Sequence, residues 1–447
     1  MVHFDAIIIG TGQSGPYLAK RFAKEGYKVA IIEEGNFGGS CVNSGCTPTK
    51  ALIANAKIAH SVRIAKTFGV NVKGFEIDYK AIKRRKDQFV RAGSDWVKDS
   101  LKKTKGITVY EGSASFEGSH QIRVGSKILE GEKIFINVGA TPLIPEQVEN
   151  VLYLTNVSLL ELKTLPKHLL ILGGGYVALE FAQMYRRFGS EVTVIQRGPR
   201  LMKKEDPEIS EAIQKILEKE KIKIYTDVSD ISFKKERSHI VAEFKKKKII
   251  TSHVLVAVGR IPNTKHLRCE NAGIKVDEKG VILVNDFLQT SLPHIWALGD
   301  CNGKGAFTHT SYNDYEIVSA NLFDQGKRRV SDRNPIYALY TDPPLGRVGL
   351  NEEQAQQKYK KVLSAVLPIS SVARAREEGQ TEGFLKILID AETNKILGAS
   401  FLGIHCDEVI QLIALVMSAK LPYTILQKSV GIHPTVSELI PTLLEKL

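Results

Sequence analysis

Residues 4–33, FDAIIIGTGQSGPYLAKRFAKEGYKVAIIE, decide how the fold is interpreted. The run from Phe4 to Ile9 is short, apolar and rich in isoleucine, which is typical of a buried strand in a parallel sheet. A glycine-rich turn, a helical pattern and a second apolar run from Lys28 to Ile32 follow it. This order of strand, turn, helix and strand predicts a βαβ unit that binds a dinucleotide.

Three glycines and one carboxylate give this unit its chemistry. Gly10 permits a tight turn, Gly12 lets the backbone approach a pyrophosphate, and Gly15 lets the helix pack closely on the strand. The helix N-terminus then presents free N–H groups and a partial positive charge to the anion. Glu33, at the end of the second run, is expected to accept hydrogen bonds from a ribose diol.

The same pattern recurs at residues 168–195, HLLILGGGYVALEFAQMYRRFGSEVTVI. Predicted strands at His168–Leu172 and Glu191–Ile195 flank a helix, and the turn reads GGGYVA from Gly173. The motif is Gly173-x-Gly175-x-x-Ala178. Two such units predict two separate dinucleotide sites.

The second unit differs from the first where its second strand ends. The residue there, usually acidic in NAD-binding units, is Gln196, followed by Arg197. Arg200, Lys203 and Lys204 are close by in the sequence. A missing carboxylate with guanidinium groups nearby suits a 2′-phosphate, so we expect NADPH, with NADH as the alternative.

A third motif, Cys41-Val-Asn-Ser-Gly-Cys46, lies between the two units. Four intervening residues are not the usual zinc spacing, and no second pair completes a metal site, so no metal is expected. Pro48 and the apolar run after it place Cys46 near a helix N-terminus, where a thiol's pKa falls. Gly39 permits close backbone approach to a cofactor. The spacing alone leaves open that these are two buried structural cysteines.

Two further motifs carry acidic groups. Asp300 follows Gly299 at the end of a predicted strand, 294–298, where its carboxylate suits a cofactor hydroxyl chain. His433 precedes Glu438 by five residues, which suits an oriented acid–base pair or, alternatively, a structural histidine. Two strand exits of similar form, NVGATP at 137–142 and VGRIP at 258–262, contain Gly139 and Gly259.

The charge of the chain is unbalanced. Lys plus Arg is 62 and Asp plus Glu is 49, a net charge of +13, with basic clusters at residues 83–86 and 245–248. A nucleic-acid or membrane surface is one interpretation, and a solvated helix face with a solvated hairpin is the other. Because aromatic residues do not alternate with these charges, we favour the second, and expect only attraction to phosphate-bearing cofactors.

Compartment is inferred from cysteine content and hydropathy. The chain has five cysteines, a sparse and odd set that argues for a reducing compartment. No apolar run reaches the roughly 18 residues that span a membrane, and the N-terminus lacks a signal-peptide pattern. We therefore expect a cytoplasmic protein that acts on a small molecule, without nucleic acid or membrane.

Taken together and in this order, the motifs resemble the class I pyridine nucleotide–disulfide oxidoreductases. GGSCVNSGCTPTK at 38–50 is the most specific signal, supported by HPTVSE at 433–438. The resemblance implies an α/β fold with two Rossmann-like dinucleotide-binding domains and a C-terminal α+β dimerisation domain. The implied limits are 1–145 and 256–331 for FAD, 146–255 for NAD(P) and 332–447 for dimerisation.

The resemblance also implies residue roles. Cys46 is the thiol against the flavin and Cys41 the interchange thiol, while Lys50 and Glu180 pair near the reactive flavin nitrogen. In the implied homodimer, His433 and Glu438 serve the active site of the partner subunit. Implied FAD ligands are Gly10, Gly12, Gly15, Glu33, Gly39, Lys50, Gly139, Gly299 and Asp300. Implied nicotinamide-nucleotide ligands are Gly173, Gly175, Tyr176, Ala178, Gln196, Arg197 and Gly259.

The implied reaction passes a hydride from NADPH to FAD, opens the Cys41–Cys46 disulfide and lets Cys41 attack a disulfide, oxidant or metal ion. The stretches 340–350 and 367–379 look like the mercuric-reductase-like branch. Mercuric reductase carries a C-terminal cysteine pair, whereas no cysteine follows Cys406 here, which puts Hg(II) in doubt. The alternatives are dihydrolipoamide dehydrogenase and, from another class, a flavin-bearing interaction protein without turnover.

Overall fold

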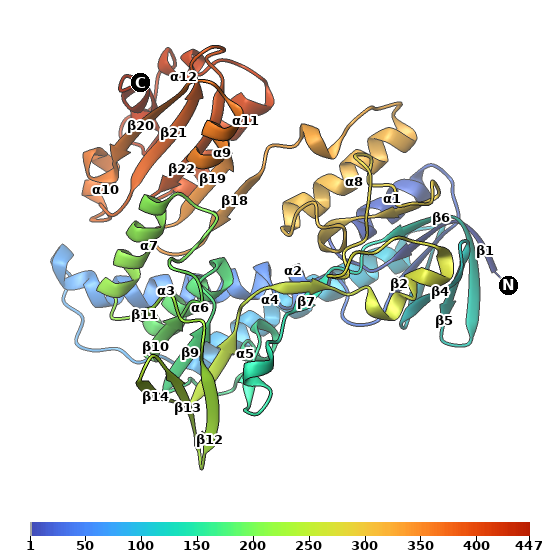
Figure 1. Cartoon of the computed structure of the whole chain (residues 1–447), viewed down its shortest axis with the longest axis horizontal. Coiled ribbons are helices and arrows are strands. Elements are labelled where there is room, and N and C mark those ends of the chain that lie inside the picture. Colours follow the sequence, from blue (N-terminus) through green and yellow to red (C-terminus); the bar gives the residue numbers. More distant parts are fainter. Residues whose placement is uncertain (1) are drawn as a thin grey trace.

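The computed structural model describes residues 2–447, and its sheets fall into three bodies (Figure 1). The first body is built on a seven-stranded sheet of order β3-β2-β1-β6-β5-β4, with β17 paired to β6. Its strands are β1 (Val2–Ile9), β2 (Val29–Glu33), β3 (Ile107–Glu111), β4 (Ala114–Gly118), β5 (Gln121–Val124), β6 (Lys127–Ile136) and β17 (Ile295–Ala297). The pairings of β1 with β2 and β6 are parallel, so the predicted βαβ start is confirmed, with α1 at Gly15–Lys24.

The second body is a five-stranded sheet of order β11-β10-β9-β15-β8, in which every pairing is parallel. Its strands are β8 (Tyr153–Leu154), β9 (His168–Leu172), β10 (Glu191–Ile195), β11 (Lys223–Tyr225) and β15 (His253–Val256). The helices α5 (Asn156–Leu159), α6 (Tyr176–Phe188) and α7 (Pro207–Lys219) belong to the same stretch. The second predicted βαβ unit is confirmed at its expected residues.

The two strand exits noted in the sequence meet each other. NVGATP contains β7 (Ala140–Pro142), VGRIP contains β16 (Arg260–Pro262), and the two strands pair antiparallel. The register places Arg260 opposite Pro142. This ribbon joins the chain segments that leave the two nucleotide-binding sheets.

The chain from the cysteine motif to residue 103 forms separate helices. These are α2 (Gly39–Asn43), α3 (Cys46–Ile64), the short 3-10 helix η1 (Ala65–Phe68) and α4 (Tyr79–Lys103), with no helix at 69–78. α3 packs against both α4 and α6. α3 therefore begins at Cys46 itself, two residues before the proline that indicated a helix start.

The third body follows α8 (Thr308–Phe323). It is a five-stranded antiparallel sheet of order β18-β19-β22-β21-β20. The strands are β18 (Ile336–Leu339), β19 (Leu345–Gly349), β20 (Val362–Pro368), β21 (Phe384–Asp390) and β22 (Ile396–Leu402). The helices are α9 (Glu352–Lys358), α10 (Ala373–Glu377), α11 (Cys406–Ser418), α12 (Thr424–Gln427) and α13 (Ile440–Leu444). This arrangement confirms the predicted C-terminal α+β domain.

The remaining elements are small. A three-stranded antiparallel sheet consists of β12 (Ser232–Glu236), β13 (His239–Phe244) and β14 (Lys247–Thr251). The other 3-10 helices are η2 (Glu146–Val148), η3 (Lys265–Leu267), η4 (Cys269–Ala272), η5 (Gly299–Asn302), η6 (Val330–Asp332), η7 (Ile369–Ser371) and η8 (Ser437–Leu439).

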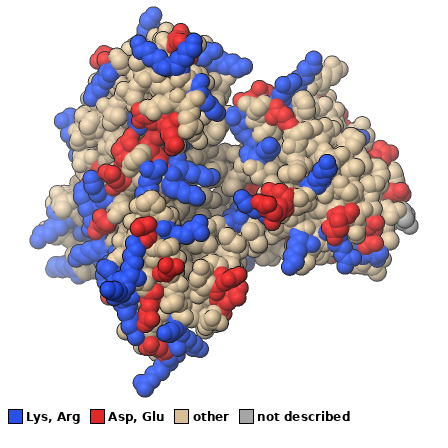
Figure 2. Space-filling model, viewed as in Figure 1, with Lys and Arg blue, Asp and Glu red and all other residues tan. Residues whose placement is uncertain are grey.

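The two basic clusters have different outcomes. Residues 245–248 are exposed and form the turn and the start of β14 in the β13–β14 hairpin, as expected, and Figure 2 shows Lys and Arg side chains over this three-stranded sheet at the bottom of the view. The cluster at 83–86 was expected to be a solvated helix face, and this is wrong for Lys86. Its side chain is only 2% exposed, and its Nζ donates to Glu161 Oε1 at 2.9 Å and to the Leu160 carbonyl at 3.0 Å. Among the described residues, no helix is both long and apolar enough to cross a membrane.

Candidate active site

The first glycine turn, between β1 and α1, has no room for a side chain at any of its three glycines. Gly10 has φ +101°, and a Cβ there would lie 2.3 Å from the Asn137 carbonyl oxygen. A Cβ at Gly12 would lie 2.7 Å from Asn137 Oδ1, and one at Gly15 would lie 2.3 Å from the Gly10 carbonyl. Asn137 Oδ1 also accepts from the amides of Gly15 and Ser14, at 3.2 and 3.4 Å. Asn137 was quoted in the sequence only as part of a strand exit, so its place inside the turn is new.

Glu33 lies at the end of β2, directly against this turn. Its Oε2 accepts from the Thr11 amide at 2.9 Å and from Thr11 Oγ1 at 2.5 Å, and its Oε1 accepts from the Gly35 amide. The Thr11 hydroxyl in turn accepts from the Gly38 amide at 3.0 Å. A turn with bare backbone at its three glycines and an oriented carboxylate at the strand end fits a dinucleotide such as FAD, because pyrophosphate and ribose need these two features.

Gly299 and Asp300 begin the 3-10 helix η5, which follows β17. This strand belongs to the same seven-stranded sheet as β1 and β2. The Asp300 carboxylate is ion-paired with the Arg260 guanidinium, which also donates to the Ala140 carbonyl. A weaker contact of 3.4 Å links Arg260 to Ser40 Oγ. Arg260 therefore connects the β7–β16 ribbon to the carboxylate expected to hold a cofactor hydroxyl chain, a link that the sequence did not indicate.

The second glycine turn, between β9 and α6, is more open. Gly173 has φ +115°, and a Cβ there would lie 2.2 Å from the Ala257 carbonyl, whereas a Cβ at Gly175 would meet nothing within 4 Å. Ala178 is fully buried against the sheet. The Gln196 side chain packs on the turn, since a Cβ at Gly174 would lie 3.1 Å from it.

The basic residues expected near the second turn face solvent. Arg197, Lys203 and Lys204 are exposed, and Arg200 is half-buried.

Both strand-exit glycines adopt positive φ, +67° at Gly139 and +146° at Gly259. These positions require glycine because other residues rarely adopt such backbone angles.

The cysteine motif is fastened to the first turn. A Cβ at Gly39 would lie 2.9 Å from Gly12 Cα, so α2, which carries Cys41, begins in contact with the turn. Cys41 is half-buried and Cys46 is exposed. Cys46 is the first residue of α3, and its Sγ lies 3.1 Å from Oγ1 of Thr308, the first residue of α8. Two helix N-termini thus meet at one sulfur.

The two thiols are electrostatically different. The hydrogen bond from Cys41 lowers the pKa of Cys46 to about 6, with further help from Thr308 and the charge of Lys50 against the opposing effect of burial. The same hydrogen bond, together with burial, raises the pKa of Cys41. These two shifts favour the thiolate, which is the reactive form, at Cys46 over Cys41.

The expected pair of Lys50 and Glu180 is present. Lys50 Nζ lies 2.8 and 3.0 Å from the two Glu180 oxygens, and the Glu180 side chain is 4% exposed. Glu180 Oε1 also accepts from the Tyr340 amide at 3.0 Å, and Lys50 lies over the Tyr340 ring. The pair connects α3 with α6 and with the loop after β18.

The other expected parts of the site are Tyr176 and the pair of His433 and Glu438. The Tyr176 ring contacts the Phe307 ring, with centroids 5.4 Å apart. His433 Nδ1 lies 2.9 Å from Glu438 Oε2, as the spacing indicated, and the His433 side chain is 74% exposed. Within residues 2–447, neither His433 nor Glu438 makes a hydrogen bond or ion pair with the side chains of Cys41 or Cys46.

The family to which these features belong was tested by comparison with known proteins. A family model described as pyridine nucleotide-disulphide oxidoreductase matches residues 4–314. A second model, described as the dimerisation domain of the same oxidoreductases, matches residues 336–444. The second match implies a homodimer.

Individual relatives cover nearly the whole chain. It is 37% identical over 448 residues to the probable pyridine nucleotide-disulfide oxidoreductase RclA of Escherichia coli strain K12, with 98% of each chain covered. It is 33% identical to a mercuric reductase of Staphylococcus aureus, covering 97% of this chain and 81% of the reductase. A solved Cu(II) complex of the HOCl-induced flavoprotein disulfide reductase RclA from Escherichia coli matches with a TM-score of 0.90 at 36% identity, covering 98% of this chain and 99% of that one.

Proposed function

The chain belongs to the pyridine nucleotide-disulfide oxidoreductase family, and from that premise we propose that it is an NADPH-dependent flavoprotein reductase of the RclA type whose electrons leave through the Cys41–Cys46 pair. Its acceptor is an electrophile that a thiolate attacks: a disulfide, a reactive oxidant or a thiophilic metal ion. One observation carries this proposal. Cys46 begins α3 beside Cys41, contacts Thr308 at 3.1 Å, and has its pKa lowered to about 6 mainly by the Cys41 hydrogen bond.

The first glycine turn, Glu33, the Lys50–Glu180 pair and Asp300 would hold FAD, which when bound supplies two-electron transfer between nicotinamide and thiols. The turn and the cysteine segment are in contact at Gly12 and Gly39, so the thiol pair would lie beside this cofactor. Lys50, neutralised by Glu180 at 2.8 Å, would place a donor near the reacting ring. Arg260 would orient the Asp300 carboxylate.

The protein's own contribution is the control of two thiols. Cys46 holds the negative charge of the reduced pair, and Cys41, with its raised pKa, keeps its proton until a base removes it. We propose that His433 of the partner subunit is that base, since His433 is exposed and oriented by Glu438 at 2.9 Å. The Cys41 thiolate then attacks the acceptor.

We also propose the domain limits expected from the sequence: 1–145 with 256–331 for FAD, 146–255 for NAD(P) and 332–447 for dimerisation. Sheet membership supports the split first domain, because β17 at Ile295–Ala297 pairs with β6 of the first sheet. The five antiparallel strands of the last body all follow residue 332.

Replacing Cys41 by Ser tests the redox pair. We expect NADPH still to reduce the bound flavin in the variant while steady-state reduction of the acceptor falls by at least about a thousandfold. Cys269→Ala, which removes a buried thiol elsewhere, serves as the control and should retain full activity. Acceptor turnover at the wild-type rate in Cys41→Ser would refute the redox-pair assignment and favour a flavin-bearing protein that transfers no electrons through thiols.

The acceptor itself needs a panel. Wild-type enzyme would be given NADPH or NADH with oxidised glutathione, lipoamide, hypothiocyanous acid, Hg(II), Cu(II) and quinones. The Escherichia coli relative, described as HOCl-induced and solved with Cu(II), favours the oxidant and Cu(II) arms. Fastest turnover in the reverse direction, from dihydrolipoamide to NAD, would instead support dihydrolipoamide dehydrogenase.

The cross-subunit base has its own test. Mixed dimers of Cys41→Ser and His433→Gln chains contain one site with both residues intact, if His433 serves the partner subunit. We expect such dimers to recover activity at one of two sites. Mixed dimers as inactive as either parent would contradict this assignment.

A further inference from the structure

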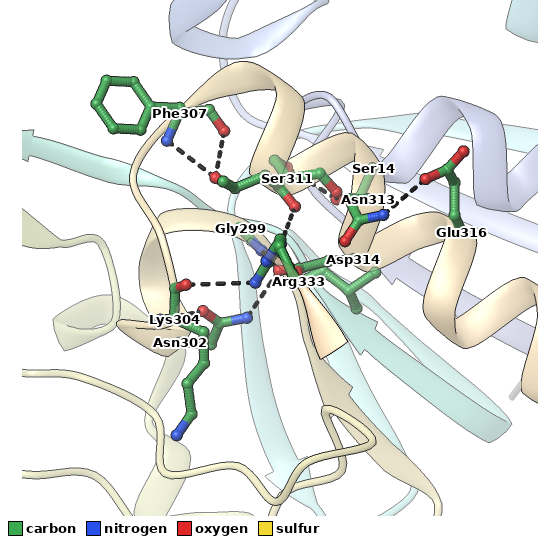
Figure 3. Close-up of polar contacts among 12 residues, drawn as sticks. Ser14, Gly299, Asn302, Lys304, Phe307, Ser311, Asn313, Asp314, Glu316 and Arg333 are labelled. Carbon is green, nitrogen blue, oxygen red and sulfur yellow. Dashed lines mark hydrogen bonds and ion pairs between the residues drawn. The ribbon is translucent and has the colours of Figure 1, made fainter. Parts of the chain in front are cut away.

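A buried ion pair lies behind the segment that carries Asp300. Asp314, in the second turn of α8, is 2% exposed. Its Oδ2 accepts from the Gly299 amide at 2.8 Å and from Asn302 Nδ2 at 2.9 Å, and its Oδ1 accepts from Arg333 Nη1 at 2.9 Å (Figure 3). One carboxylate thus holds both ends of η5, the turn that contains Asp300.

Arg333 comes from the segment between α8 and the C-terminal sheet. Its Nη1 also donates to the Thr310 carbonyl at 2.8 Å, and its Nη2 donates to the Lys304 carbonyl at 3.3 Å (Figure 3). The guanidinium therefore holds the loop that leads into α8 and the first turn of α8 itself. Its planar fork makes these contacts together, which a lysine cannot do.

The two ends of segment 299–308 contact groups of the candidate active site. At one end, Asp300 is ion-paired with Arg260 beside the first glycine turn. At the other end, Thr308 lies 3.1 Å from Cys46 Sγ. Hydrogen bonds from the Asp314–Arg333 pair reach residues next to both ends and the loop between them.

The segment is also packed against the first turn. A Cβ at Gly299 would lie 2.8 Å from Ser311 Oγ and 2.9 Å from Asn137 Nδ2. Ser14 Oγ in turn contacts the carbonyl of Ser311 at 2.5 Å. A small shift of α8 would therefore move both the turn and the residues that lie against it.

We propose that Asp314 and Arg333 are positioning residues that fix Asp300 for FAD binding and Thr308 for stabilising the Cys46 thiolate. The inference rests on the proposed function, because FAD and the thiolate are its two readouts. A buried charge that loses its partner is strongly destabilising, so either side chain alone is unfavourable here and the pair acts as a unit. Hydrogen bonds to a carboxylate are about twice as strong as neutral ones, which makes the turn stiff.

Asp314→Asn in the full-length holoprotein tests the proposal. We expect flavin release, followed by the rise in flavin fluorescence on dilution, to be at least about tenfold faster than in wild type. We also expect the pH midpoint of Cys46 alkylation in the reduced protein to rise by at least about half a unit. A purely structural role would lower the thermal unfolding temperature without moving that midpoint.

Asp324→Asn is the matched control. Asp324 directly follows the last residue of the same helix and forms an ion pair with Arg21. It lies at the surface, at the opposite end of the helix from Thr308. We expect its flavin release and alkylation midpoint to equal those of wild type. The substitution and the type of partner are the same, so the two variants differ in burial and in location.

Arg333→Lys keeps the test decisive if Asp314→Asn fails to fold. It retains the charge beside Asp314 but loses the fork to Thr310 and Lys304, and we expect flavin release to be at least about threefold faster. Wild-type behaviour of Arg333→Lys and of any folded Asp314→Asn would overturn the proposal. A wild-type protein that retains no FAD, or whose Cys46 titrates as an ordinary thiol, would instead refute the proposed function.

Discussion

The two βαβ units have nearly the same backbone but different surroundings. Gly10 and Gly173 both adopt positive φ, and a Cβ at either would lie within 2.3 Å of a carbonyl oxygen just beyond a neighbouring strand. Those carbonyls belong to Asn137 after β6 and to Ala257 after β15. The tight bend at the first glycine is therefore imposed in the same way twice, and this bend alone does not distinguish one nucleotide from another.

The side chains at the end of the second strand make the difference. In the first unit, Thr11 of the turn donates its amide and hydroxyl to Glu33. In the second unit the position of Thr11 is Gly174, where a Cβ would lie 2.9 Å from the Leu201 side chain and 3.1 Å from the Gln196 side chain. The turn thus orients a carboxylate in one unit and accommodates a neutral amide in the other. From this comparison we propose that the turn places the pyrophosphate, whereas the strand end and its contact with the turn select the sugar.

A second difference concerns how open each turn is. Gly12 lies against Asn137 and Gly39, while Gly175 has open space around it. A turn that is covered by the start of the cysteine-bearing helix α2 suits a cofactor that stays bound. An open turn suits a cofactor that enters and leaves in every cycle. We therefore propose that the first unit holds a resident cofactor and the second an exchanging one.

Matched glycine substitutions test this division with the largest expected effect. In Gly12→Ala the new Cβ would lie 2.7 Å from Asn137 Oδ1, so we expect loss of bound FAD, at least a hundredfold loss of activity, and destabilisation of about 1–3 kcal/mol from overpacking. In Gly175→Ala the protein should be as stable as wild type, but KM for NADPH should rise about tenfold because the methyl group occupies the approach of the pyrophosphate. Flavin content, thermal unfolding and steady-state kinetics measure all three quantities. Equal behaviour of the two variants would break the comparison.

The thiolate beside the first unit gives the next largest effect. The lowered pKa of Cys46, about 6, means that the thiolate is present above pH 6 and is lost as the pH falls below it. At pH 7 an ordinary thiol is only a few per cent thiolate, so Cys46 should be alkylated about tenfold to a hundredfold faster. Iodoacetamide labelling of the reduced protein between pH 5 and 9 measures the midpoint. Cys269, whose pKa burial raises to about 11, is the internal control, and a midpoint for Cys46 near 9 would contradict the assignment.

Much of the two units could be predicted because their signals are local. The predicted strands 168–172 and 191–195 coincide with β9 and β10, and the strand expected from Phe4 lies within β1. Short apolar runs that end at glycine or charged residues determine such strands without reference to the rest of the chain. The Lys50–Glu180 and His433–Glu438 contacts followed from the family resemblance and from spacing.

The unpredicted contacts join residues that are distant in sequence. Thr308 reaches Cys46 across 262 positions, and Arg260 reaches Asp300 through the pairing of β7 with β16. No periodicity or motif encodes such a contact, since it depends on how complete sheets pack. Lys86 is the opposite case, because a local charge cluster suggested exposure and the distant Glu161 made burial possible.

The strand end of the second unit can be changed toward the first. Gln196→Glu combined with Arg197→Gln restores a carboxylate and removes a guanidinium, so KM for NADPH should rise about tenfold relative to KM for NADH. The expected reason is the loss of one charge-assisted contact with the 2′-phosphate, at the lower end of the about 1.5–3 kcal/mol that such contacts contribute. Lys248→Gln, which removes one charge from the exposed hairpin, is the control and should leave the ratio unchanged. Equal changes in the two constants would mean that Gln196 and Arg197 do not read the phosphate.

The smallest effect is expected at the contact that distinguishes the two turns. Thr11→Val removes the hydroxyl that donates to Glu33 and accepts from the Gly38 amide, while keeping the size of the side chain. Glu33 then remains bound by the amides of Thr11 and Gly35, and loss of the hydroxyl's hydrogen bond to Glu33, worth about 1 kcal/mol, should make flavin release about threefold to tenfold faster. Thr193→Val removes a similar buried hydroxyl from β10, where it contacts His168 at 2.9 Å, and should affect stability without affecting flavin release. If both variants release flavin at the wild-type rate, the position of Glu33 is set by its strand and not by Thr11. The difference between the Thr11–Glu33 contact and the Gly174–Gln196 contact would then not determine which nucleotide each unit holds.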